Sequence, residues 1–276
     1  MKWYLFAVAA LLLCFFTGQD ARAQITIFNV PSSDVTPKGF LYQENEAQFR
    51  PYNPDPFYLG THYSAVGVGY CTEIDVTTLN ISAPYNGLTS LGVGFKSVIP
   101  LFPNKKLFKD RELKFVVGDL VCTGLGNGAG AGNWFYALGG AKLPGTNTRV
   151  TGGITTGTKQ VFGSNVTCFT GGIEQSITKK LSLQLDWYSG KNNGLGFLIP
   201  GFCYVLPQDI LFFGGYQIPN HRTNGRSGFV VEIGKFFNLA NLRPSVRRGD
   251  PRPQSTSSEP PDPFAIADSL KKSESQ

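Results

Sequence analysis

The sequence predicts an all-β chain that closes as an antiparallel transmembrane β-barrel of about twelve strands. Three observations favour this fold. Glycine and aromatic residues are frequent among the 276 residues (33 glycines, 13% aromatic), and there is only one methionine. Twelve segments have strand character and run roughly nine to thirteen residues, the length that a tilted strand needs to cross a bilayer. Their number is even, as in single-chain bacterial barrels.

The first residues have the features of an export signal. Lys2 precedes an apolar run from Leu5 to Phe16, which is too short to span a bilayer as a helix. Ala21-Arg22-Ala23 fits the small-x-small pattern of a cleavage site. Residues 1–23 are therefore predicted to be a signal peptide, and the mature chain is expected to begin at Gln24.

The clearest strand lies in the stretch from Gly171 to Gly194. Its apolar residues, Leu181, Leu183, Leu185 and Trp187, alternate with polar ones. This period of two gives one apolar and one polar face. Such a strand suits a membrane barrel with lipid outside and water inside, and it also suits a soluble sheet over a core.

The other strands are separated by turn residues. The three prolines in the stretch from Arg50 to Pro56 have no backbone N–H to donate to a neighbouring strand. Further breaks are expected at Asn86-Gly87, in the glycine-rich run 124–132 and at Pro144-Gly145. The expected strands are Lys38–Arg50, Phe57–Tyr70, Glu73–Ile81, Thr89–Leu101, Glu112–Cys122, Asn133–Leu143, Arg149–Thr158, Val166–Ile177, Leu181–Gly190, Leu195–Val205, Ile210–Ile218 and Ser227–Phe237.

The predicted connections alternate between short and long. Short periplasmic turns opposite longer outer loops are typical of outer-membrane barrels, which predicts a bacterial outer-membrane location with both termini in the periplasm. Two connections depart from the alternation. Residues 102–111 form a long connection on the short side, and Lys191 to Gly194 form a short one on the long side.

The barrel is expected to span residues 38–238, between two segments of different composition. Residues 24–37 contain two prolines and form an N-terminal lead-in. Residues 239–276 are rich in proline and serine and predict a mostly disordered periplasmic tail. Within that tail, Phe264 to Lys272 is alternatively a short amphipathic helix that contacts a periplasmic partner.

Four motifs carry a resemblance to known proteins. They are Val30–Gly39, Gly67–Asp75, Leu181–Lys191 and Gly214–Asn220. With them, nearly the whole mature chain resembles a group of uncharacterised, porin-like bacterial outer-membrane β-barrel proteins. The resemblance implies the cellular location and the architecture, and it implies no particular substrate or active site. One departure is that about forty residues follow Phe236-Phe237, where many such barrels end, so insertion would need an internal signal.

Three acidic residues are candidates for the barrel lumen. If the apolar faces of their strands contact lipid, the alternation turns Glu174, Asp186 and Glu232 inward, and places Glu174 and Asp186 on neighbouring strands. Lumen charges tune the selectivity of a pore. The alternative is a salt-bridge network that fills a narrow barrel, with Arg149, Lys179 or Lys235 as partners.

Little in the sequence indicates an enzyme or a cofactor. The glycine-rich run 124–132 lacks the following helix that a dinucleotide site needs. No C-x-x-C pair is present, so no metal is expected. The two histidines, His62 and His221, would have to meet Ser64, Ser189 or Ser227 to form the site of a barrel-type lipid hydrolase, and their spacing gives no sign of it.

The function expected from these features is a small channel or passive transport pore. The expected partners are the lipid bilayer, the barrel-insertion machinery and a small solute. Because basic and acidic residues are interspersed, a nucleic-acid partner is not expected. The alternatives are a structural or adhesive barrel that binds a partner through its loops or tail, and a soluble secreted β-sandwich.

Overall fold

The computed structural model describes residues 26–52, 56–81, 89–102, 112–125, 130–162, 166–190, 195–222, 225 and 227–242. The predicted signal peptide and nearly all of the predicted tail lie outside these residues. The chain divides into two units, 1–237 and 238–276. The described part of the second unit is short and contains the 3-10 helix η4 (Leu239–Leu242). No helix within the described ranges is long and apolar enough to cross a bilayer.

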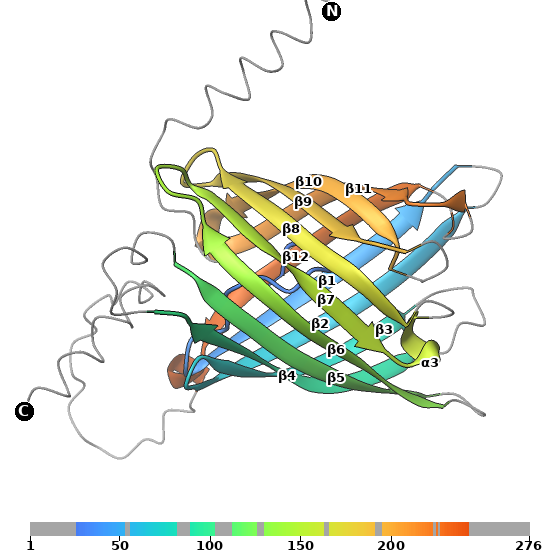
Figure 1. Ribbon diagram of the computed structural model, residues 1–276, viewed down its shortest axis with the longest axis horizontal. Helices are drawn as coiled ribbons and strands as arrows, with labels where there is room; N and C mark the ends of the chain where they lie inside the picture. Colours follow the sequence, from blue (N-terminus) through green and yellow to red (C-terminus); the bar gives the residue numbers. More distant parts are fainter. Residues whose placement is uncertain are drawn as a thin grey trace, which may run out of the picture. The chain divides into compact units, whose positions relative to one another are not determined.

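Twelve strands form one closed antiparallel barrel (Figure 1). Each strand pairs with its neighbours in the sequence, and β12 returns to lie beside β1. Every strand end falls within two residues of its predicted position, because the period-two alternation marks each strand clearly. The strands are β1 (Phe40–Arg50), β2 (Phe57–Gly69), β3 (Thr72–Ile81), β4 (Ser90–Pro100), β5 (Lys114–Gly124), β6 (Ala131–Lys142), β7 (Thr148–Gly157), β8 (Thr167–Ser176), β9 (Leu181–Tyr188), β10 (Phe197–Leu206), β11 (Ile210–Pro219) and β12 (Gly228–Asn238).

The outer wall of the barrel is largely apolar. On β9, Leu183 and Trp187 are 44% and 41% exposed, whereas Asp186 between them is 1% exposed. The same alternation exposes large apolar side chains on other strands, among them Ile74, Val93, Phe115, Val121, Ile154, Phe169, Ile173, Phe229 and Ile233. An apolar outside over a polar inside is the arrangement of a transmembrane barrel, so the soluble sandwich is excluded.

The two ends of the barrel differ in their connections. At the turn end, where β1 begins, tight connections at 70–71, 143–147, 177–180 and 207–209 join consecutive strands, and 101–113 is the long exception. At the loop end, where β1 finishes, the connection 158–166 contains helix α3 (Lys159–Phe162), which was predicted to be loop. The connection expected to be short, Lys191 to Gly194, in fact extends over 189–196.

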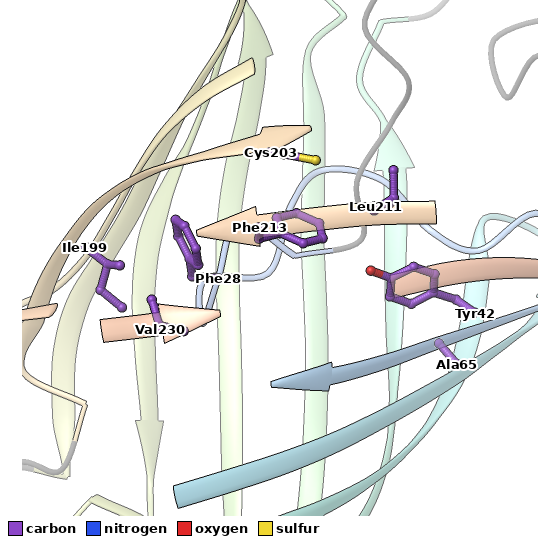
Figure 2. Packing of buried hydrophobic residues seen from close by; sticks show 8 residues of the cluster. All are labelled: Phe28, Tyr42, Ala65, Ile199, Cys203, Leu211, Phe213 and Val230. Atoms are coloured by element: carbon purple, nitrogen blue, oxygen red, sulfur yellow. The ribbon is translucent and has the colours of Figure 1, made fainter. Parts of the chain in front are cut away.

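The predicted N-terminal lead-in lies inside the barrel. We call residues 26–38 the luminal segment. Its apolar side chains belong to three buried clusters: Phe28 to one, Val30 to a second and Val35 to a third. Figure 2 shows the ring of Phe28 among side chains of the first cluster. They come from five strands and are Tyr42, Ala65, Ile199, Cys203, Leu211, Phe213 and Val230. The segment therefore forms the centre of the core.

Inward-facing glycines let the luminal segment approach the wall. A Cβ at Gly67 would collide with the carbonyl oxygen of Pro37, and Lys38 pairs with Gly67 in an isolated parallel bridge. On β10, a Cβ at Gly201 would collide with the ring of Phe28. These two strand positions have no room for a side chain, because the segment occupies that space.

Three of the four cysteines in the described part of the chain are buried small side chains. Cys122, Cys168 and Cys203 point inward, and Cys71 is exposed in the turn between β2 and β3. None of the four forms a disulfide with another. The buried ones therefore pack as small hydrophobic residues.

The lipid-facing assignment of the wall predicts a depth-dependent cost of charge. Ile233 lies near the middle of β12 and is 51% exposed. We expect Ile233→Lys to lower the free energy of unfolding by about 2–4 kcal/mol in lipid vesicles, as lysine does at a bilayer midplane. Denaturant titration followed by tryptophan fluorescence measures it.

The matched control is Tyr58→Lys, at an outward position next to the loop end of β2. There the expected loss is only about 0–1 kcal/mol. Equal losses at Ile233 and Tyr58 would contradict a lipid-facing belt.

Candidate functional site

The candidate site is the lumen, where the luminal segment meets inward-facing charges. A buried segment that is not a strand leaves backbone N–H groups without ladder partners, so they need other acceptors. Asp186 on β9 supplies one. Its Oδ2 accepts hydrogen bonds from the N–H groups of Asn29 at 2.7 Å and Val30 at 2.8 Å. The hydroxyl of Tyr188, also on β9, donates to the carbonyl of Asn29 at 2.7 Å.

A second carboxylate anchors the other part of the segment. Glu73 at the start of β3 is fully buried, and its Oε2 accepts a hydrogen bond from the N–H of Thr36 at 2.5 Å. Its other oxygen forms an ion pair with Lys96 on β4 at 2.8 Å and accepts from the hydroxyl of Tyr63 at 3.2 Å. The ion pair with Lys96 and the hydrogen bond from Tyr63 compensate the burial of Glu73, which therefore can hold the segment.

A third anchor runs from the segment to the barrel. Asp34 contacts Lys114 on β5 at 2.9 Å and Arg149 on β7 at 2.5 Å. Burial by itself would raise the pKa of Asp34, but the charges of Arg149 and Lys114 hold that pKa below its usual value. Arg149 also lies 3.7 Å from Glu174 on β8, so it links the segment to two neighbouring strands.

The three predicted lumen acids all point inward, and they have different surroundings. Glu174 and Asp186 lie on neighbouring strands, where Gly172 is opposite Asp186 and Glu174 is opposite Gln184. Glu174 pairs with Arg149 as the salt-bridge interpretation proposed, while Asp186 holds the luminal segment. Glu232 is fully buried on β12 and interacts electrostatically with the carboxyl groups of Glu44, Glu46 and Asp186.

Two of the basic residues considered as partners lie elsewhere. Lys179 belongs to the turn between β8 and β9 and is exposed. Lys235 lies three residues after the inward-facing Glu232 on β12, so it has the outward parity. Its amine lies 5.7 Å from the ring centroid of Phe237. Arg149 is therefore the one of the three that joins the charge network of the lumen within the described residues.

A cavity remains between the luminal segment and the loop end. It has a volume of about 410 Å³, and Phe28 and Asn29 of the segment form part of its wall. Its charged lining consists of three acidic side chains and one basic one: Glu44, Glu46, Asp75 and Lys96. The interior is thus filled by the segment toward one end and hollow, with an acidic lining, toward the other.

One pair considered for catalysis does come together, on the outer wall. His62 and Ser64 are two residues apart on β2, so they share its outward face, and Ser64 Oγ lies 3.1 Å from His62 Nε2. Their spacing was expected to give no sign of this, which is incorrect for two residues in one strand. Asn45 on β1 is 2.9 Å from His62 Nδ1. Ser189 instead accepts from the N–H of Phe169.

Comparison with known proteins gives structural likenesses but no family. No protein-family model and no curated protein matches the chain. Among solved structures, the crystal structure of the Acinetobacter baumannii outer membrane protein Omp33 is similar, with 11% identity and a TM-score of 0.40. The match covers 73% of this chain and 98% of that one. The class of the protein, a twelve-stranded antiparallel transmembrane barrel, rests on its own strand pairing and apolar wall.

Some lumen residues were not predicted from the sequence, although a signal was present. Glu73, Asp75 and Thr77 alternate with Ile74 and Val76, and this period-two pattern marks Glu73 and Asp75 as inward. Asp34 carries no such signal, because no periodicity indicates that its segment enters the barrel.

The ion pairs of Asp34 predict how the luminal segment responds to mutation and pH. Asp34→Asn leaves two buried cations without their carboxylate, so we expect it to weaken segment binding by about 3–5 kcal/mol. Hydrogen exchange of the amides of residues 26–38 measures this. Asp119→Asn is the control, because Asp119 accepts from Asn133 on β6 instead.

The pH dependence follows from the lowered pKa of Asp34. A carboxyl whose folded pKa is depressed stabilises the fold above its ordinary value of 3.8 and loses that effect as pH falls through the lower folded pKa. Wild-type amides of the segment should stay protected down to about pH 4 and lose protection below it. Loss of protection between pH 7 and 5 would contradict this anchor.

Proposed function

We propose that this protein is a bacterial outer-membrane channel that its own N-terminal segment closes. The observation that carries the proposal is the luminal segment itself, which is held by ion pairs and hydrogen bonds rather than by a disulfide. The cavity on its other side is lined by charged side chains together with apolar ones. A barrel with charged groups in its lumen and an apolar outer wall suits a solute pathway through a membrane.

In this proposal, the small channel or passive transport pore expected from the sequence is gated. Phe28, Val30 and Val35 occupy the middle of the barrel in the closed form. Solute passage requires the segment to leave or to shift, and each anchor is a non-covalent contact that can open. The turn end faces the periplasm in this proposal, so the segment gates the pathway from the periplasmic side.

The charges of the cavity favour cations as the permeating class. Three carboxylates against one lysine amine give the lining an excess of acid. Lumen charges of one sign raise the local concentration of counter-ions and set selectivity. We therefore propose small cations or cationic solutes as the cargo.

Planar-bilayer conductance tests the gate. We expect the wild-type protein to conduct little, and deletion of residues 26–37 to raise the mean current at least several-fold, with a preference for cations. Arg149→Gln should raise the open fraction because it removes one anchor. Lys142→Gln is the matched control, since this lysine pairs with Glu112 at 3.6 Å rather than with the segment.

The outcomes separate the channel from the structural or adhesive alternative. A deletion variant that is folded, as judged by its heat-shifted band on a gel, and that still passes no current would contradict the gated channel and favour a binding role. Cation preference should also fall in the double variant Glu46→Gln, Asp75→Asn, because it removes two of the three acidic side chains in the lining.

A further inference from the structure

The outer wall carries a cluster of polar side chains where β1, β2 and β3 lie side by side. Its members are Gln43, Asn45, His62, Ser64 and Thr78, which all face outward on a wall that is largely apolar. The five lie on adjacent strands: Asn45 is opposite His62, Gln43 is opposite Ser64, and Thr78 is opposite His62 on the other side. Polar and ionisable groups facing lipid are costly, so such a patch indicates a functional site.

One tautomer of the neutral histidine satisfies both hydrogen bonds within the patch. The side-chain oxygen of Asn45 can only accept, so His62 Nδ1 carries the proton and donates it across 2.9 Å. In the neutral ring, Nε2 is then an acceptor. It lies 3.1 Å from Ser64 Oγ, so the serine hydroxyl donates to it. The chain of bonds runs from serine to histidine to asparagine.

This order is that of an activated serine nucleophile. A serine becomes nucleophilic when an adjacent base takes its proton, and the base is itself oriented by a third group. Ser64, His62 and Asn45 occupy these three places, and the two neighbouring strands hold them in register. Exposure agrees with access from the membrane, since His62 and Ser64 are only partly buried and Asn45 is exposed.

The local backbone adds two features that suit a substrate. Between the pairs Gly60–Ile81 and His62–Thr78 the register shifts, so Thr61 faces two residues of β3. Such a bulge re-aims side chains and leaves backbone groups outside the ladder, and bulges are frequent beside active sites. Next to Asn45 and His62, toward the loop end, Ala47 is opposite Gly60. Because both residues are small, few side-chain atoms protrude from the outer face at this position.

We propose that Ser64, His62 and Asn45 form a second functional site, a serine esterase on the outer wall that cleaves acyl esters of lipids in the surrounding bilayer. Ser64 Oγ attacks the ester carbonyl while His62 Nε2 takes its proton. His62 then returns that proton to the departing alcohol oxygen, which leaves an acyl-serine. Water attacks this ester, again through His62, and releases the fatty acid and free Ser64. Asn45 is a positioning residue.

Covalent labelling of the folded protein in nonionic detergent tests the nucleophile. Hexadecanesulfonyl fluoride, a lipophilic serine reagent, should modify Ser64, as located by peptide mass mapping. Ser64→Ala and His62→Ala should abolish the labelling. Ser97→Ala is the matched control, because Ser97 faces outward on β4 with the hydroxyl of Thr72 at 2.8 Å as its partner rather than a histidine.

Hydrolysis is measured as fatty acid released from mixed micelles of dioleoyl phosphatidylethanolamine. We expect His62→Ala to lower the rate by about 10²–10⁴-fold, the usual contribution of a general base. Asn45→Ala should lower kcat with little change in KM, and Asn45→Asp should restore much of it, because a carboxylate orients the same nitrogen. A purely structural role of Asn45 would not give this rescue.

Three results would overturn the proposal. The first is a folded, heat-modifiable wild-type protein that neither reacts at Ser64 nor releases fatty acid. The second is equal labelling of Ser64 and Ser97. The third is a change in oligomeric state of Ser64→Ala and His62→Ala without any hydrolysis by the wild type, which would make the patch a contact between copies. We expect these variants to leave the conductance unchanged, because the substituted side chains face outward. A negative result for hydrolysis would therefore not count against the channel proposal.

Discussion

The structure depends on one constraint, which is that a buried backbone must have its N–H groups satisfied. The luminal segment has no strand to pair with along most of its length, so carboxylates of the wall replace the missing ladder. Asp186 and Glu73 accept from its N–H groups, and Asp34 reverses the direction by accepting from basic residues of the wall. Because these contacts come from β3, β5, β7 and β9, the segment ties distant parts of the barrel together.

The period of two along each strand allows one wall to carry two kinds of chemistry. Inward residues of β1 and β2, such as Glu44 and Tyr63, line the lumen and its cavity. Their outward neighbours, Asn45, His62 and Ser64, form a polar patch that faces the membrane. The two faces share a backbone and no side chain, so the proposed pore inside and the proposed hydrolytic site outside place no conflicting demands on the same residues.

Much of the barrel could be predicted from the sequence, and the site only in part. Alternation located all twelve strands and turned Glu174, Asp186 and Glu232 inward, because parity is a local property. The partners of these acids were not predictable in the same way. Whether Asp186 binds a solute or the segment depends on where residues 26–38 lie, and that is a long-range contact. The approach of Asn45 to His62 depends on the register of β1 and β2.

The position of the luminal segment is the central claim, and an engineered disulfide tests it most directly. A Cβ built at Gly172 on β8 lies 3.5 Å from the Cβ of Ile27, which suits a disulfide. In a variant that lacks the native cysteines, Ile27→Cys with Gly172→Cys should oxidise to an intramolecular bond, identified by peptide mass mapping. Ile27→Cys with Gly171→Cys, which faces outward, should not. Two free thiols in the first variant under oxidising conditions, with the barrel folded, would contradict the account.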